Sequence, residues 1–298
     1  MSTETTSTQI TPPRALTIAG SDSGGGAGIQ ADLKTFAAFG VYGLSAITAI
    51  TAQNTQEVRS AYELPATSVA EQIDVVLEDI GAQAAKTGML ANAQIIEAVV
   101  ERIRHWQLRV VVDPVMRAKS GDALLQSKAV DALRKQLLPL AEVITPNLPE
   151  AEVLTGRIVK TSYEMREAAR AIHDLGVQHV VVKGGHREEE PIDIYFDGSH
   201  FHELRAERLE TRHTHGTGCT FSAAITALLA RGYTVPEAIA EAKTYITGAI
   251  RYAPGIGHGH GPVEHFWRWH PVTTLADAVG ADVYPWPRPP ITTLDQQS

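Results

Sequence analysis

The chain has 298 residues, of which 44% are hydrophobic, and its 26 lysines and arginines against 34 aspartates and glutamates give a formal net charge of −8. This much apolar sequence is enough for a sizeable core and excludes a globally disordered chain. The acidic balance argues against a general nucleic-acid binder, which needs a cationic surface to displace counterions. It does not exclude a phosphate site, because backbone N–H groups and one lysine are enough to build one.

Cysteine usage and the N-terminal sequence bear on the compartment. Cys219 is the only cysteine, so no intramolecular disulfide is possible, which is typical of a reducing compartment. The N-terminal residues lack the apolar core of a secretory signal, and no apolar run reaches the ~18 residues that span a bilayer. We therefore expect a soluble, cytoplasmic protein with neither a membrane nor a nucleic-acid partner.

Short apolar runs alternate with segments of helical periodicity along most of the chain. A loose tail is expected at residues 1–13. The apolar runs predict strands at residues 15–20, 44–51, 84–89, 109–113, 142–145 and 179–183. The periodic segments predict helices at residues 29–40, 69–80, 92–106, 122–138, 149–154, 165–175, 220–230 and 235–250, with Gly40 as the C-terminal cap of the first.

This alternation predicts an α/β fold with a mostly parallel sheet and helices on both faces. Ligands are then expected at the carboxyl ends of the strands. No sharp linker interrupts the middle of the sequence, so we expect one domain at residues 14–270 between the tail and a C-terminal extension, residues 271–298, of unassigned role. The Pro285-Trp-Pro-Arg-Pro-Pro290 run in that extension is incompatible with a regular helix.

A glycine-rich turn, residues 24–28, follows the first predicted strand. It fits neither the dinucleotide fingerprint nor the Walker A pattern. Two interpretations remain open: a tight strand-to-helix turn, or a place where a small ligand approaches bare backbone.

A second glycine-rich segment, Gly216-Thr217-Gly218-Cys219, precedes a strongly apolar-periodic helix. Glycines on both sides of the threonine let successive N–H groups converge at the helix start, where the dipole adds about half a positive charge. This is the design of an anion hole for a phosphoryl group. The pKa of the Cys219 thiol is expected to fall from about 8.5 toward neutrality in this first turn. The alternative is a buried cysteine that acts as a small hydrophobe.

Two further polar groups follow predicted strands. Asn147 and Glu150 place an amide and a carboxylate three positions apart, which suits Mg²⁺ and its waters but also suits a helix start with capping groups. Lys183 ends an apolar strand, where it would meet a nucleotide phosphate, although a lone lysine is more often a solvated surface residue.

The histidines of the C-terminal third raise the question of zinc. The spacing of His213, His215, His258, His260 and His265 matches no closed structural zinc pattern. The run of residues 255–262, Gly-Ile-Gly-His-Gly-His-Gly-Pro, is more simply a glycine-rich loop.

Taken together and in order, the motifs resemble the hydroxymethylpyrimidine/phosphomethylpyrimidine kinases of thiamine synthesis, which belong to the ribokinase-like superfamily. The resemblance runs from about Arg14 to His270. It rests on Ala19-Gly-Ser-Asp22, Gly25-Gly-Ala-Gly-Ile-Gln-Ala-Asp-Leu-Lys-Thr35, Thr51-Ala-Gln-Asn-Thr55, Lys86-Thr-Gly-Met-Leu90, Asp113-Pro-Val-Met116, Ile144-Thr-Pro-Asn-Leu-Pro-Glu150, Lys183-Gly-Gly-His186 and Thr214-His-Gly-Thr-Gly-Cys-Thr220.

The resemblance implies a ribokinase-like three-layer α/β/α sandwich, a homodimer, and ATP with Mg²⁺ as the phosphoryl donor. It implies two reactions, phosphorylation of 4-amino-5-hydroxymethyl-2-methylpyrimidine and then of its monophosphate. The implied site residues fall into four groups. They are Gly20, Asp32, Gln53 and Met89 for the pyrimidine, Asp113 and Glu150 for Mg²⁺, Asn147, Lys183 and Lys243 for ATP, and Gly216, Thr217, Gly218 and Cys219 for catalysis.

Two of these assignments, Gln53 and Cys219, are also supported by the chemistry of their side chains. The amide of Gln53 offers a donor and an acceptor, as an aminopyrimidine edge requires. A thiolate at Cys219 would accept the alcohol proton in the first step, whereas the second step attacks with an oxygen that is already anionic. On this hypothesis Cys219→Ala harms the first step more than the second. The alternatives are a pyridoxal kinase of the same branch and a non-enzymatic vitamin-binding protein.

Overall fold

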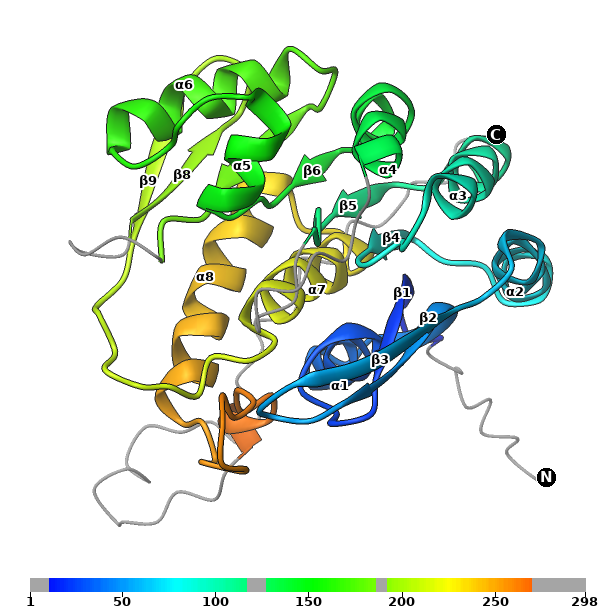
Figure 1. Cartoon of the computed structure of the whole chain (residues 1–298), viewed down its shortest axis with the longest axis horizontal. Helices are drawn as coiled ribbons and strands as arrows, with labels where there is room; N and C mark the ends of the chain where they lie inside the picture. The colour runs from blue at the N-terminus through cyan, green and yellow to red at the C-terminus, as the bar shows by residue number, and fades with distance from the viewer. Residues whose placement is uncertain (1–10, 117–126, 186–191, 270–298) are drawn as a thin grey trace, which may run out of the picture.

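The computed structural model describes residues 11–116, 127–185 and 192–269. These residues form one nine-stranded sheet with strand order β3-β2-β1-β4-β5-β6-β7-β8-β9 (Figure 1). The central strands pair in parallel: β2 (Tyr42–Gln53), β1 (Arg14–Asp22), β4 (Ala84–Thr87), β5 (Val110–Val112), β6 (Val143–Ile144) and β7 (His179–Val182). The antiparallel strands lie at the two edges: β3 (Val58–Glu63), β8 (Ile192–Phe196) and β9 (Phe201–Arg205).

The predicted strands are confirmed with small shifts of their ends, but the three antiparallel edge strands were missed. β3 and β9 have mostly exposed or half-buried residues, because only one side of an edge strand packs on the core. The apolar runs that mark a buried strand are therefore absent from them.

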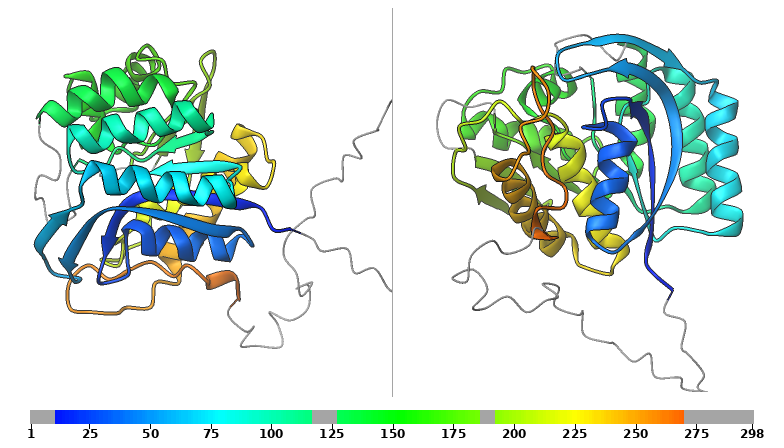
Figure 2. Two further views of the ribbon diagram at one scale, coloured as in Figure 1. Left: turned by 90° about the vertical axis from the view of Figure 1, so that its right-hand side faces the viewer. Right: turned by 90° about the horizontal axis from the view of Figure 1, so that it is seen from below.

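Helices cover both faces of the sheet (Figure 2). On one face lie α1 (Gly28–Ala38), α7 (Thr217–Ala230) and α8 (Val235–Arg251). On the other lie α2 (Ala66–Asp79), α3 (Ala93–Trp106), α4 (Ser127–Ala132), α5 (Leu148–Thr155) and α6 (Ser162–His173). The valines of β5 show how one strand serves both cores: Val110 and Val112 pack on one face and Val111 on the other, as the pleat requires. The three-layer α/β/α prediction is confirmed.

Helix ends follow local chemistry. Capping boxes begin α6, where Thr161 pairs with Glu164, and α8, where Thr234 pairs with Glu237. Gly40 is left-handed (φ +67°) just beyond α1, so it ends the helix as predicted.

The helix predicted at residues 122–138 is wrong as a single regular helix. Residues 122–126 lie outside the described residues, and α4 passes into a π-helical turn (Leu133–Leu137) and a 3₁₀ turn (Leu138–Leu140). Pro139 has no N–H and crowds the carbonyl four positions earlier, which prevents a regular α-helical ending there.

The flanking segments are tested only in part. Residues 1–10 and 270–298 lie outside the described residues, so the loose tail and the C-terminal extension stay predictions, as do the limits of the domain at residues 14–270. Within the described ranges, no helix has the length and apolarity to cross a membrane.

A buried ion pair joins the sheet to α1. Lys86 of β4 and Asp32 of α1 are both 0% exposed, and the Lys86 Nζ lies 2.9 Å from the nearer Asp32 oxygen. The hydroxyl of Thr17 donates a further hydrogen bond to Asp32 (2.6 Å). Burial alone would lower the pKa of Lys86, but the facing Asp32 carboxylate raises it; burial raises the pKa of Asp32, against the charge of Lys86 and the Thr17 hydrogen bond. We take the pair as ionised, because Nζ lies within 3.0 Å of both Asp32 oxygens.

We expect Lys86→Met to lower the free energy of unfolding by about 3–5 kcal/mol, because Asp32 would stay buried without its partner. Lys135→Met is the matched control, since Lys135 forms an exposed pair with Asp131 at 3.8 Å that contributes at most about 1 kcal/mol. Urea unfolding followed by circular dichroism measures both variants. Equal losses in the two variants would contradict an ionised pair.

Candidate active site

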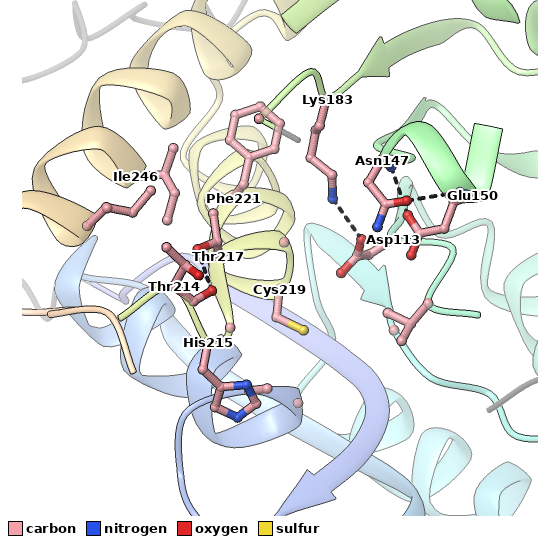
Figure 3. A pocket seen from close by; sticks show the side chains of 18 of the residues that line it. Asp113, Asn147, Glu150, Lys183, Thr214, His215, Thr217, Cys219, Phe221 and Ile246 are labelled. Atoms are coloured by element: carbon pink, nitrogen blue, oxygen red, sulfur yellow. Dashed lines mark hydrogen bonds and ion pairs between the residues drawn. The ribbon is translucent and has the colours of Figure 1, made fainter. Parts of the chain in front are cut away.

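A cavity of about 710 Å³ opens at the carboxyl ends of the parallel strands. Its walls come from the segments that follow β1, β4, β5, β6 and β7 and from the start of α7 (Figure 3). The ligand position expected from the sheet topology is therefore confirmed as a cavity. Of the thirteen predicted site residues, all except Asp32 line it.

Asp22, at the end of β1, organises the glycine-rich turn. Its carboxylate accepts hydrogen bonds from the N–H groups of Gly24 (2.8 Å), Gly26 (3.0 Å) and Ala27 (2.8 Å). It also lies 2.8 Å from Nε2 of His215. Burial would raise the pKa of Asp22, but the hydrogen bond and charge of His215 and the backbone donors lower it, so the group is a carboxylate.

The glycine-rich turn packs backbone to backbone against the start of α7. Gly216 is left-handed (φ +81°), and a Cβ there would lie 1.7 Å from the carbonyl oxygen of Gly26. Gly28 is also left-handed (φ +56°), and a Cβ there would lie 2.2 Å from the oxygen of Gly20. A tight turn is therefore confirmed, and the glycines are required because any side chain would separate these segments.

The start of α7 has the features of an anion hole. Gly216 occupies the N-cap and provides no side-chain hydrogen bond. The Thr217 N–H reaches the Thr214 oxygen at 3.4 Å, and the N–H groups of Gly218 and Cys219 lie in the first turn, where a helix has no intrahelical acceptor for them. A Cβ on Gly218 would lie 3.1 Å from Nζ of Lys183 and 3.7 Å from both carboxylate oxygens of Asp113. Bare backbone and a cation thus face the same small space.

Lys183 and Asp113 form an ion pair beside this helix start, with Nζ 3.3 Å from the Asp113 oxygen (Figure 3). Lys183 is held by its own backbone, which donates to the oxygen of Pro146 at 2.8 Å. The lysine is therefore fixed in the cavity wall rather than solvated.

Asn147 and Glu150 form a capping box at the start of α5. The Glu150 N–H donates to Asn147 Oδ1 (2.9 Å), and the Asn147 N–H donates to Glu150 Oε2 (2.8 Å). The capping interpretation of this motif is thus confirmed, and the two residues also line the cavity. Burial raises the pKa of Glu150 to about 7, with Lys183 lowering it and Asp113 raising it further.

The carboxylates of Asp113 and Glu150 fit Mg²⁺. Both are buried, at 2% and 7% exposure, and the charge of Asp113 raises the pKa of Glu150, so the two lie close enough to repel. Mg²⁺ prefers oxygen ligands and keeps several waters, so two carboxylates suffice. Within the described ranges, this site included, no group of three or more His, Cys, Asp or Glu side chains is placed to hold a metal.

The expectation of a lowered pKa at Cys219 is wrong. The thiol lines the cavity between His215 on one side and Asp113 on the other (Figure 3). Burial raises its pKa to about 12, and the negative charges of Asp113 and Asp32 add to the rise. The charge of Lys86 and a hydrogen bond from the Gly28 backbone lower it less than burial raises it. The helix start does not compensate for the loss of solvent.

Gly20, Gln53 and Met89 all line the cavity, and Gln53 lies beside His215, at the end away from Lys183 in Figure 3. The Met89 methyl group lies 2.6 Å from where a Gly20 Cβ would be, so glycine is needed for the thioether to lie there. The Gln53 amide Oε1 accepts from Thr51 (3.2 Å), and its Nε2 lies 3.3 Å from His215 Nε2. Asp32 lies beneath this end, where it faces Lys86 rather than the cavity.

Lys243 of α8 lies at the other end of the cavity. Its Nζ is 2.7 Å from Asp193 of β8, whose second oxygen accepts the N–H of Gly184 at 2.9 Å. Ile246 and Ile250, one and two turns further along α8, add apolar wall. This end combines cations with apolar surface, which suits a nucleotide.

Sequence reasoning missed four residues that organise the site: Asp22, Lys86, Asp193 and His215. Asp22 had a signal, because an aspartate before a glycine run commonly accepts turn N–H groups. Lys86 also had a sequence signal, because it is a charged residue within the otherwise mostly apolar strand Ala-Ala-Lys-Thr. Asp193 and His215 had none, since their partners are distant in sequence.

The fold and the site together define a small-molecule phosphotransferase of the ribokinase-like class: a parallel sheet whose carboxyl edge carries a glycine-lined anion hole, a paired lysine and two carboxylates. The sequence pattern of the phosphomethylpyrimidine kinase family matches residues 22–264, and the chain belongs to that family.

Individual relatives agree with this assignment. The hydroxymethylpyrimidine/phosphomethylpyrimidine kinase of Streptomyces coelicolor is 51% identical over 258 residues, which cover 87% of this chain and 96% of that protein. The crystal structure of phosphomethylpyrimidine kinase from Clostridium difficile 630 is 47% identical, with a TM-score of 0.72 over 80% of this chain and 99% of that one. Bacillus subtilis pyridoxal kinase, in an ADP complex, is 44% identical, with a TM-score of 0.82 over 87% of this chain and 100% of that one.

Alkylation of Cys219 tests the raised pKa directly, because this is the only thiol in the chain. We expect iodoacetamide to react more than about tenfold more slowly at pH 7.5 than with N-acetylcysteine, and the rate to keep rising above pH 9, since only the thiolate reacts. The urea-unfolded protein is the control and should react like the free thiol. A half-maximal rate near pH 7 in the folded protein would contradict the raised pKa.

Proposed function

We propose that this protein transfers the γ-phosphoryl group of ATP to 4-amino-5-hydroxymethyl-2-methylpyrimidine and then to the resulting monophosphate. The observation that carries the proposal is that one cavity holds both the candidate pyrimidine wall, Gln53 and Met89, and the candidate phosphoryl site at Gly218 and Lys183. The curated relatives with this activity in their names match nearly their whole length.

In this proposal the pyrimidine lies against Gly20 and Met89, with the Gln53 amide at its polar edge. The Thr51 hydroxyl lies 3.2 Å from the amide oxygen and 2.9 Å from the Ser21 carbonyl oxygen, so the amide oxygen keeps a lone pair, and the N–H₂ group is also left, for the ring. The Asp32–Lys86 pair supports this end from below, with Lys86 bordering the cavity and Asp32 behind it. The acceptor hydroxymethyl group then points toward Cys219 and the start of α7.

The phosphoryl group is received by the N–H groups of Gly216, Thr217, Gly218 and Cys219. Their positions are set by the packing of Gly216 on Gly26, so little rearrangement is needed as charge develops. Lys183 binds the ATP phosphates, with Asn147 beside it and Lys243 nearer the nucleoside. Mg²⁺ held by Asp113 and Glu150 would neutralise phosphate charge when bound.

A protonated thiol at Cys219 is compatible with phosphoryl transfer, because this reaction needs little general-base catalysis. Phosphoryl transfer passes largely through a loose transition state, so removal of the alcohol proton contributes little before the new bond forms. We therefore place Cys219 at the acceptor oxygen, and its part in the first and second steps stays a prediction.

Pyridoxal is the second candidate acceptor. Its support is the likeness to a pyridoxal kinase at 44% identity and a TM-score of 0.82. Both acceptors are flat heterocycles with a hydroxymethyl group. The paired donor and acceptor of Gln53 favour the aminopyrimidine.

We further propose that the protein acts as a homodimer in the cytoplasm. The family resemblance supports the dimer, and the single cysteine suits a reducing compartment. Sedimentation equilibrium of the purified chain measures the oligomeric state.

The function is tested by a coupled ADP-release assay with Mg²⁺–ATP and three separate acceptors: the pyrimidine alcohol, its monophosphate and pyridoxal. We expect turnover of both pyrimidines, with kcat/KM for pyridoxal at least about tenfold lower, because pyridoxal lacks the adjacent exocyclic amine and ring nitrogen that would pair with both groups of the Gln53 amide. Turnover of pyridoxal alone would keep the kinase assignment and contradict the acceptor.

The Mg²⁺ proposal predicts a pH dependence. A carboxylate must be deprotonated to bind a metal, so a Glu150 pKa of about 7 means that Mg²⁺ affinity rises between pH 6 and pH 8, by about tenfold. Calorimetric titration of Mg²⁺ into the ADP-bound protein measures this. Glu150→Gln keeps an oxygen for the Asn147 N–H and removes the charge, so its affinity should be weaker and should change less with pH. An identical pH profile in the variant would contradict a role for Glu150.

A further inference from the structure

The glycine-rich loop at residues 255–262, which we call the glycine strap, connects two walls of the cavity without lining it. None of its residues is among those that line the cavity. It follows α8 and runs to the tip of the β2–β3 ribbon, where it is drawn in orange in Figure 1. Its histidines, His258 and His260, have no part in the proposed chemistry, so the loop needs another explanation.

On one side the strap contacts the β2–β3 turn and forms hydrogen bonds with Thr55. The His260 N–H donates to the Thr55 carbonyl oxygen (2.8 Å), and the Gly259 N–H donates to the Thr55 hydroxyl (3.2 Å). A Cβ on Gly259 would lie 2.0 Å from that carbonyl oxygen, and one on Gly257 would lie 2.4 Å from the hydroxyl. Only a chain without side chains at these two positions approaches the turn so closely.

On the other side the strap pairs with the segment that leads into the anion hole. The His215 N–H donates to the oxygen of Gly261 (3.0 Å), and the Val263 N–H donates to the oxygen of His215 (3.4 Å). His260 adds a hydrogen bond from Nδ1 to the oxygen of Arg212 (3.1 Å). The backbone just before Gly216 is therefore fixed from outside the cavity.

The two segments that the strap contacts border the two parts of the proposed site: the turn at Thr55 follows the pyrimidine wall, and the residues before Gly216 lead into the anion hole. Thr55 lies two positions after Gln53, at the tip of a two-stranded ribbon whose outer strand, β3, is at the sheet edge. Such a ribbon has little stability of its own beyond the sheet. Inside the cavity, the side chains of His215 and Gln53 also meet, at 3.3 Å.

We propose that the glycine strap is a positioning device that sets the distance between the pyrimidine-binding wall and the phosphoryl-receiving start of α7, with Thr55, Gly257 and Gly259 as its positioning residues. The proposal rests on the proposed function for its kinetic consequences. A displacement of about 1 Å between reacting groups lowers rates strongly. A loosened strap should therefore weaken binding and reaction of the acceptor more than binding of ATP, because the proposed ATP lysines, Lys183 after β7 and Lys243 on α8, do not contact the strap.

Gly257→Ala tests the proposal, with Gly232→Ala as the matched control. Both glycines are left-handed (φ +84° and +88°), so both variants carry the same backbone strain, but a Cβ on Gly232 meets nothing within 4 Å. We expect Gly257→Ala to raise KM for the pyrimidine about tenfold and to lower kcat, with KM for ATP changed less than about twofold. Gly232→Ala should leave KM for the pyrimidine, kcat and KM for ATP within about twofold of the values for the unmodified protein. Parallel rises in both KM values, or no change in either, would overturn the strap.

Hydrogen exchange separates failure of the strap from failure of the proposed function. In Gly257→Ala, the amides of residues 53–58 and 215–219 should exchange faster than in Gly232→Ala, whichever acceptor the enzyme uses. Unchanged exchange in both segments would overturn the proposal even if the pyrimidine is the substrate. Should Gly257→Ala fail to fold, Thr55→Ala gives the same test, because it removes the hydroxyl that accepts from Gly259 and keeps the carbonyl. It should then show a smaller change in the same direction.

Discussion

The site depends on a contact between two stretches of bare backbone, the glycine-rich turn after β1 and the N-cap of α7. Gly216 approaches Gly26 so closely that no Cβ fits between them. Asp22 makes this contact possible, because its carboxylate collects three N–H groups of the turn and the ring of His215. The glycine-rich turn and the anion hole therefore belong to one rigid unit, although their residues are distant in sequence.

Three lysines around this unit are each paired with an aspartate from another element. Lys86 of β4 faces Asp32 of α1, Lys183 of β7 faces Asp113 after β5, and Lys243 of α8 faces Asp193 of β8. A buried ammonium group is costly without a partner, so each pair holds a cation at the cavity in the absence of substrate. The pairs differ in purpose. Lys86 borders the cavity too, but it and Asp32 are fully buried and join sheet to helix, whereas Lys183 and Lys243 are partly exposed and available to phosphates.

The same burial explains why Cys219 differs from a reactive thiol. Its helix start and the neighbouring Lys86 favour the thiolate, but loss of solvent and two carboxylates favour the thiol more strongly. A neutral group at this place suits an enzyme whose acceptor is first an alcohol and then a phosphate monoester, because a fixed negative charge would repel the second acceptor.

The sequence by itself determined the α/β class, the parallel strands and the cavity-lining motifs, because buried strands and glycine-rich turns leave local patterns of apolar runs and glycines. The antiparallel strands β3, β8 and β9 were missed: β3 and β9 are mostly exposed or half-buried and lack that pattern, and the charged Asp193 interrupts the short buried strand β8. The position of Asp32 behind Lys86, the His215–Asp22 contact and the grip on Thr55 were decided only by tertiary structure, because each joins residues far apart in the chain. The pKa of Cys219 was decided there too: local sequence shows the helix start, but the burial and the charges of Asp113 and Asp32 that outweigh it are brought together only by the fold.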